Sequence, residues 1–211
     1  MMLRRVLRTV VLMAIGAVSC RVAAASTLVE VNGPVVLSPS GFFGQSVTTL
    51  GGGPFDHITF NFFDASNNPT ASGTLFLLSQ EYTILKDASD NPANLSTSTA
   101  GYIAKSTSIS GGVFQFDPSV TLQGNTKYFF YSNTQFLVSQ TTATIYPGGN
   151  SWAASGSSDA FRGAEAQLNF RLSGTPAVPL PSALSLGAVS LTALLFSRAI
   201  HCRKTLGAKI E

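Results

Sequence analysis

The pair Asp56-His57 is the place in the centre of this chain where adjacent residue types could support general-base chemistry. A hydrolytic triad also needs a nucleophile, and Ser46 or Ser79 would have to meet the histidine in the folded chain. Neighbouring side chains of a strand point to opposite faces, so Asp56 would not orient His57 unless a bulge intervened. The Gly-x-Ser-x-Gly turn of the α/β-hydrolases is absent from the sequence. We therefore interpret His57 as a solvent-facing strand residue and expect no catalytic residue and no enzyme, with a secreted hydrolase as the weakest alternative.

Two segments, residues 64–69 and 87–92, repeat a pattern of Asp, Asn and Ser ahead of a proline at an offset of 23 residues. Clustered side-chain oxygens in a loop are the ligands that Ca²⁺ prefers. Neither segment has the glycine and the terminal glutamate of an EF-hand loop, and Asx-turns before a proline explain both segments without a metal. We expect no cofactor and no metal ligand here, with Ca²⁺ as the alternative.

Trp152 is the single tryptophan, and it lies in the turn-rich segment 148–163 with Tyr146 and Phe161 nearby. An aromatic ring in a loop of a β-domain can stack on a sugar, which makes Trp152 a candidate ligand contact. A lone tryptophan in such a domain also serves as a core residue or a loop anchor. Both interpretations stay open at this point.

The segments that would carry these residues are predicted to be strands. Apolar and polar residues alternate in 57–63 and in 166–172, which is typical of half-buried antiparallel strands. The inward residues would be Ile58, Phe60, Phe62, Leu168, Phe170 and Leu172. Further strands are expected at 28–31, 74–78, 113–116, 127–131 and 135–146, separated by Gly, Pro and Asn turns. This pattern predicts an all-β fold, an antiparallel and jelly-roll-like β-sandwich.

Charge is distributed unevenly along the 211 residues. Eight of the 13 basic residues lie in the two end segments, whereas the central part has five basic and nine acidic residues and a net charge of −4. A mildly acidic domain without a basic patch lacks the electrostatic footprint of a nucleic-acid binder. Both cysteines, Cys20 and Cys202, also lie in the end segments, so the central part contains no thiol.

The first 25 residues have the three parts of a secretory signal peptide. Three arginines fall within the first eight residues, residues 9–20 are apolar, and Ala23 and Ala25 fit a small-residue cleavage site. A signal helix of twelve apolar residues rises about 18 Å, which is too short for a hydrocarbon core of about 30 Å. We expect signal peptidase to cut after Ala25. The alternatives are a lipoprotein signal ending at Cys20 and a twin-arginine signal at Arg4-Arg5.

The C-terminal segment begins with Val178-Pro179-Leu180-Pro181 and continues as an uncharged apolar run over residues 182–197. The two prolines enforce an extended approach, and the run rises about 24 Å as a helix. A basic cluster of Arg198, Arg203 and Lys204 follows. The pattern predicts a short transmembrane helix with a cytoplasmic basic flank, with an ordinary membrane anchor as the alternative to a processed tail.

These three features in this order resemble the PEP-CTERM sorting signal of bacterial envelope proteins. The resemblance implies that an exosortase, a membrane-embedded processing enzyme, removes the tail. The family's usual motif is Val-Pro-Glu-Pro, and Leu180 stands here in place of the acid. The central part weakly resembles the choice-of-anchor domains of secreted bacterial proteins, through residues 60–63, 91–95, 122–128, Trp152 and 170–174. That second resemblance implies a secreted β-sandwich.

We therefore expect three regions, a signal peptide over 1–25, a β-sandwich over 26–175 and a sorting signal over 176–211. The chain is predicted to be an exported bacterial surface or extracellular-matrix protein with a structural or adhesive role, anchored first in the envelope membrane and then displayed or released. Its expected partners are signal peptidase, an exosortase-like enzyme, the membrane and exopolysaccharide, but no nucleic acid. The alternative is an envelope carbohydrate-binding module.

Overall fold

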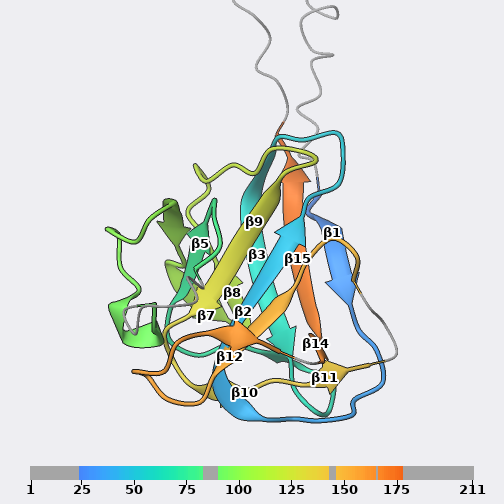
Figure 1. The fold of residues 1–211 in the computed structure, drawn as a ribbon. Coiled ribbons are helices and arrows are strands. Elements are labelled where there is room, and N and C mark those ends of the chain that lie inside the picture. The colour runs from blue at the N-terminus through green and yellow to red at the C-terminus, as the bar shows by residue number, and fades with distance from the viewer. Residues whose placement is uncertain (1–23, 83–89, 143–145, 165, 178–211) are drawn as a thin grey trace, which may run out of the picture. The chain divides into compact units, whose positions relative to one another are not determined.

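The computed structural model describes residues 24–82, 90–142, 146–164 and 166–177, which form antiparallel β-sheets (Figure 1). The all-β expectation is confirmed for this part of the chain. Within the described ranges, no helix has the length and the apolar character needed to cross a bilayer. The expected signal helix and C-terminal helix fall outside the described residues. The chain divides into a unit Met1–Ala177 and a unit Val178–Glu211, and the fold below is that of the first unit.

The described strands form two main sheets. The first has the spatial order β1 (Ser26–Val31), β15 (Phe170–Pro176), β3 (Phe55–Phe63), β8 (Val113–Gln115) and β7 (Ser108–Ser110), with β4 (Pro69–Thr70) beside β3. The second has the order β13 (Arg162–Gly163), β12 (Ser151–Ala154), β2 (Ser40–Thr48), β9 (Lys127–Ser132), β5 (Leu75–Leu78) and β6 (Tyr102–Lys105), with β10 (Phe136–Leu137) beside β2. A small pair joins β11 (Gln140–Thr141) to β14 (Gln167–Leu168), and a 3-10 turn η1 (Pro92–Asn94) follows β5.

A phenylalanine-rich core lies between the two sheets. Phe60 of β3 stacks on Phe130 of β9 with ring centroids 4.5 Å apart, and on Phe170 of β15 at 5.7 Å. Ile58 and Phe62, the other inward residues expected on β3, are fully buried. Because Phe60 belongs to the first sheet and Phe130 to the second, these contacts hold the sheets face to face in a sandwich-like arrangement.

The second sheet is also buried on its other face. Tyr128 and Phe130 project into the core between the sheets, whereas Phe129 and Tyr131 project to the opposite side. A second apolar cluster covers that side, made of Phe42, Phe76, Leu78, Tyr82, Leu95, Phe129, Tyr131, Trp152, Ala154 and Phe161. Burial strongly raises the pKa of the Tyr131 hydroxyl, which accepts a hydrogen bond from the Tyr82 amide at 3.1 Å.

Four strands of the second sheet, β2, β6, β12 and β13, were not expected from the sequence. β2 contains Gly41 and Gly44 and is buried on both faces, so it shows no alternation of apolar and polar residues. β12, which carries Trp152, lies in the segment interpreted as a loop, and it pairs with β2 so that Trp152 faces Gly44. A side chain at Gly44 would collide with the ring of Tyr131. The missing side chain therefore makes room for the aromatic rings of the second cluster.

The described chain enters and leaves at one end of the first sheet. Ser26, the first residue of β1, is paired with Gly174 of β15, and its hydroxyl donates to the Gly174 carbonyl. The amide of Ala177 donates to the carbonyl of Pro54 at 2.9 Å. Pro54 follows the end of β2, whereas Ser40 begins that strand at the opposite end (Figure 1). The nine residues of β2 separate the two ends by about 30 Å.

Candidate functional site

A β-bulge brings Asp56 and His57 together. Ser173 pairs with Thr59 and Thr175 pairs with Asp56, so two residues of β3 face the single residue Gly174. His57 takes a left-handed backbone with φ of 49°, and its Nδ1 lies 2.8 Å from the Asp56 carboxylate. From the sequence, Asp56 could orient His57 only if a bulge interrupted the strand, and this bulge is present. The imidazole points to solvent with 61% of its side chain exposed.

Neither candidate serine completes this pair in the described structure. The hydroxyl of the buried Ser46 accepts from the Asn150 amide at 2.8 Å, and the hydroxyl of Ser79 donates to the Gly101 carbonyl. Ser46 lies on β2 of the second sheet, whereas His57 lies on β3 of the first. The geometry therefore provides an oriented, exposed imidazole without a nucleophile at hydrogen-bond distance from it among the described residues.

The first oxygen-rich loop is satisfied by its own backbone. One carboxylate oxygen of Asp64 accepts from the amides of Ser66 and Asn68 at 2.8 and 2.9 Å, which is the expected Asx-turn. The second loop lies partly outside the described residues, and its Asn91 side chain caps η1 by accepting from the Asn94 amide. No group of three or more metal-ligating side chains occurs in the ranges that the structure describes. The calcium alternative stays a prediction.

Trp152 is part of the second apolar cluster. The residue is 4% exposed, and its ring centroid lies 5.6 Å from that of Tyr131 and 5.9 Å from that of Phe129. It presents no open ring face of the kind that stacks on a sugar. The role as a core residue therefore has direct structural support, whereas contact with a ligand stays a prediction.

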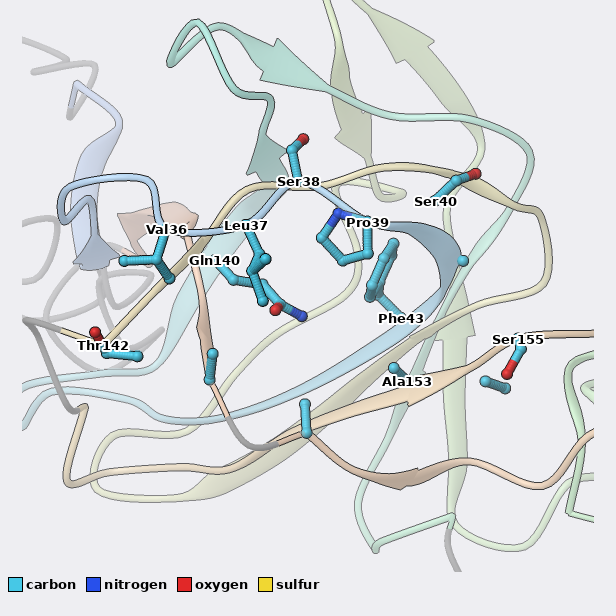
Figure 2. Close-up of a pocket in the computed structure, with 14 residues that line it drawn as sticks. Val36, Leu37, Ser38, Pro39, Ser40, Phe43, Gln140, Thr142, Ala153 and Ser155 are labelled. Carbon is cyan, nitrogen blue, oxygen red and sulfur yellow. The ribbon is translucent and has the colours of Figure 1, made fainter.

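An apolar groove lies beside the start of β2. It has a volume of about 740 Å³, and its lining comes from three parts of the chain (Figure 2). Val36, Leu37 and Pro39 form one side, with Gln140 next to Leu37, and Ala153 and Ser155 lie across from them. The remaining lining residues are Ser38, Ser40, Gly41, Phe43, Thr142, Ala154, Ala164 and Ala166.

A smaller and more polar hollow of about 420 Å³ adjoins this groove, because the two share Thr142, Ala164 and Ala166. Its wall contains side-chain hydroxyls and amides, and one edge of Trp152 contributes to it. Its other lining residues are Thr141, Gly149, Asn150, Ser151, Gly163 and Gln167. The side-chain amide of Gln167 donates to that of Gln45 at 2.8 Å, which fixes this wall to β2.

None of the described residues that line the two hollows is ionisable. Arg171 and Glu30 form a charged pair on the first sheet, away from the residues that line the hollows, and two parallel hydrogen bonds of 2.9 Å join them. These bonds lower the pKa of the Glu30 carboxyl, and the guanidinium also lies 5.3 Å from the centre of the Phe63 ring.

Sequence analysis did not find the groove. The available signal was the apolar triplet Val35-Val36-Leu37 between two prolines, Pro34 and Pro39, in a segment without alternation. The signal-cleavage residue Ala25 is described and exposed, directly before β1, whereas Ala23 lies outside the described residues. The sorting motif over 178–181 and the basic cluster of Arg198, Arg203 and Lys204 also lie outside them.

No protein-family model, no curated protein and no solved structure matches this chain.

Proposed function

We propose that this chain is an exported bacterial cell-surface or extracellular-matrix protein with a structural or adhesive, non-enzymatic role, sorted through a PEP-CTERM-like tail. Signal peptidase would remove residues 1–25, and an exosortase-like enzyme would process the tail at the membrane. The all-β unit would then be displayed on the surface or released. An ordinary membrane anchor and a lipoprotein signal at Cys20 are the alternatives for the two ends.

One observation carries this proposal, namely that the folded unit fills the interval between the two signals. β1 begins at Ser26, directly after the expected cut at Ala25, and β15 ends at Pro176, two residues before Val178. A domain whose first and last strands stop at the processing boundaries loses none of its core when both ends are removed.

The test is the intact mass and the cell fraction of the mature protein in its native host. We expect a chain that begins at Ser26, ends within residues 178–181 and occurs at the cell surface or in the medium. A mass that includes the tail to Glu211 would remove the sorting resemblance and leave a plain membrane-anchored protein. A mass that begins at a lipidated Cys20 would replace the signal-peptidase cut with lipoprotein processing.

We also propose that the fold is a jelly-roll variant. Eight described strands support this when they are taken in chain order as β1, β2, β3, β5, β6, β8, β9 and β15. The first, eighth, third and sixth of them are neighbours in one sheet, and the second, seventh, fourth and fifth are neighbours in the other. Repeated crossing between two antiparallel sheets, with the first strand beside the last, is typical of two interlocked Greek keys. β12 then extends the second sheet beyond β2.

Carbohydrate binding is the second candidate function, and the polar hollow favours it. Hydroxyls, amides and a neutral wall suit hydrogen bonding to an uncharged polysaccharide. The exposed Asn150 lines this hollow, whereas the exposed Asn68 lies in the loop after β3. If the hollow binds exopolysaccharide, Asn150→Ala should reduce retention on the immobilised polymer and Asn68→Ala should not. Equal retention of both variants and the wild type would dismiss this candidate.

A further inference from the structure

The connection between β1 and β2 contains the one Asn-Gly dipeptide of the sequence, Asn32-Gly33. Asn32 is exposed and directly follows the last residue of β1, whereas Gly33 is buried. Asparagine is among the thermolabile residues. A following glycine has no side chain and wide conformational freedom, so its backbone nitrogen can approach the asparagine side chain. This dipeptide is therefore chemically labile, and it lies where the chain leaves the first sheet.

The reaction open to this dipeptide is deamidation through a cyclic imide. The Gly33 backbone nitrogen loses its proton to solvent and attacks Cγ of the Asn32 side chain, which forms an N–Cγ bond. The Cγ–Nδ2 bond breaks, and Nδ2 takes up a proton and leaves as ammonia. Water then opens the imide at either carbonyl and leaves an aspartate or an isoaspartate at position 32. Water is the co-reactant, and no group is oxidised or reduced.

The fold holds the attacking nitrogen in a buried hydrogen bond. The Gly33 amide donates to Oδ1 of Asn169 at 3.0 Å, and the Gly33 carbonyl accepts from Nδ2 of Asn169 at 3.1 Å. We call these two bonds from one side chain the amide clamp. Asn169 is fully buried, and its Nδ2 also donates to the Ser139 hydroxyl at 3.0 Å. Loss of the Gly33 amide proton would also cost a buried hydrogen bond, so the clamp makes this nitrogen a poor nucleophile.

Two further contacts restrict the same connection. A Cβ at Gly33 would collide with the Thr141 side chain, so the Gly33 backbone has no room to move toward β11. The Asn32 side chain forms a hydrogen bond with the Glu30 carboxylate, which helps to lower the pKa of that group. Cyclisation therefore requires a local opening in which Gly33 leaves the clamp and the Asn32 side chain leaves Glu30.

We propose that Asn32-Gly33 is a site of spontaneous deamidation and that the amide clamp of Asn169 sets its rate. The product places a second carboxylate next to Glu30, and an isoaspartate also adds one carbon to the backbone before Gly33. That added carbon displaces Gly33 from the clamp, so the connection between β1 and β2 does not return to its first state. A chain displayed outside the cell accumulates this change with age, and this last step alone rests on the proposed function.

The test incubates the full chain in a mild detergent at mildly alkaline pH and follows the peptide that contains position 32. Mass spectrometry measures the conversion of amide to acid, and an isoaspartate-specific methyltransferase labels one of the two products. Asn169→Ala removes the clamp. Asn61→Ala is the matched control, because Asn61 is also buried but its side chain donates to the Phe62 carbonyl. We expect the wild type and Asn61→Ala to convert at least about 10-fold more slowly than the chain unfolded in urea, and Asn169→Ala to convert at least about fivefold faster than the wild type.

Circular dichroism first checks that each variant is folded. If Asn169→Ala is unfolded, Ser139→Ala takes its place, because it removes the bond that holds the Asn169 side chain from the other side, and a smaller increase in rate is then expected.

Three outcomes would overturn the proposal. One is a folded wild type that converts as fast as the unfolded chain, and another is a folded wild type in which no conversion is detected. The third is an equal rate in the folded clamp variant and in Asn61→Ala. None of these results depends on how the two ends are processed, so the intact-mass measurement tests the proposed function separately.

Discussion

Among single residues, the bidentate pair of Arg171 and Glu30 makes the folding stability depend on pH. The hydrogen bonds from Arg171 lower the pKa of Glu30 in the folded chain. A lowered carboxyl pKa contributes stability that is fully present above the unfolded value and is lost as the pH falls through the folded value. Both side chains are about one-third exposed, so solvent and salt screen the pair.

We expect Glu30→Gln to lower the free energy of unfolding by less than about 1 kcal/mol at neutral pH. The difference from the wild type should vanish once the pH falls below the folded pKa of Glu30, because the wild-type carboxyl is then neutral as well. Urea titrations between neutral pH and pH 3 measure this, with Arg171→Gln and the double variant closing a double-mutant cycle. A difference that persisted unchanged at low pH would mean that packing against Phe63, not charge, stabilises the pair.

His57 illustrates a backbone requirement at the same scale. Its φ of 49° lies in the left-handed region, where a β-branched side chain is strongly disfavoured. We expect His57→Val to destabilise the fold by about 1–2 kcal/mol, and His57→Gly to leave the stability within about 0.5 kcal/mol. Thr59→Val, two residues along the same strand, is the control without positive φ. Equal stability of the two valine variants in urea would show that the bulge relaxes at no cost.

Among elements, β12 depends on its tryptophan for its place at the edge of β2. Trp152 contacts the rings of Phe129 and Tyr131 on the far face of the second sheet. Truncation to alanine leaves a cavity among aromatic rings, and we expect Trp152→Ala to cost about 3–5 kcal/mol. Trp152→Phe should lose less, because a smaller ring still fills part of the space. Urea midpoints measure both, and a Trp152→Ala variant as stable as the wild type would place the residue outside the core.

Burial on both faces did not by itself hide a strand, since β9 was predicted and is buried on both faces. β3 was predicted from the alternation of Ile58, Phe60 and Phe62 with His57 and Thr59. β2 has no such alternation, since the second cluster covers its outer face and Gly44 leaves room for the ring of Tyr131. Whether the outer face of a sheet is covered depends on segments that are distant in the sequence. The local pattern of apolar residues in one strand carries no information about those segments.

The same limit applies to the candidate sites. The sequence showed that Asp56 could orient His57 only through a bulge, but the bulge arises from the register between β3 and β15 opposite Gly174. The groove is a similar case. Its lining combines residues 36–41 and Phe43 with Gln140, Thr142, residues 153–155, Ala164 and Ala166, which only the sheet pairing brings together. The amphipathic pattern of a single segment cannot encode a hollow between three segments.

For the whole molecule, the main constraint is that β15 ends at Pro176, two residues before the proposed processing motif begins at Val178. β15 lies between β1 and β3, its last two residues pair with Asp56 and Phe55 of β3, and the Ala177 amide is bonded to the Pro54 carbonyl. Proteases act on backbone that is free to leave its hydrogen bonds. If the tail is processed at 178–181, residues upstream of the cut must be drawn from a central strand. The end of β15 would then limit the rate of processing.

We therefore expect a four-residue Gly-Ser spacer inserted between Ala177 and Val178 to speed removal of the tail several-fold. Pulse-chase labelling followed by mass analysis measures the rate in the native host. The same spacer inserted at the exposed turn of Gly111, between β7 and β8, controls for a general effect of insertion on folding. An unchanged rate of tail removal with the C-terminal spacer would mean that the enzyme needs only residues beyond Ala177. Pairing of β15 would then not slow the cut. Faster processing would show that pairing in the central strand and processing compete for the same residues.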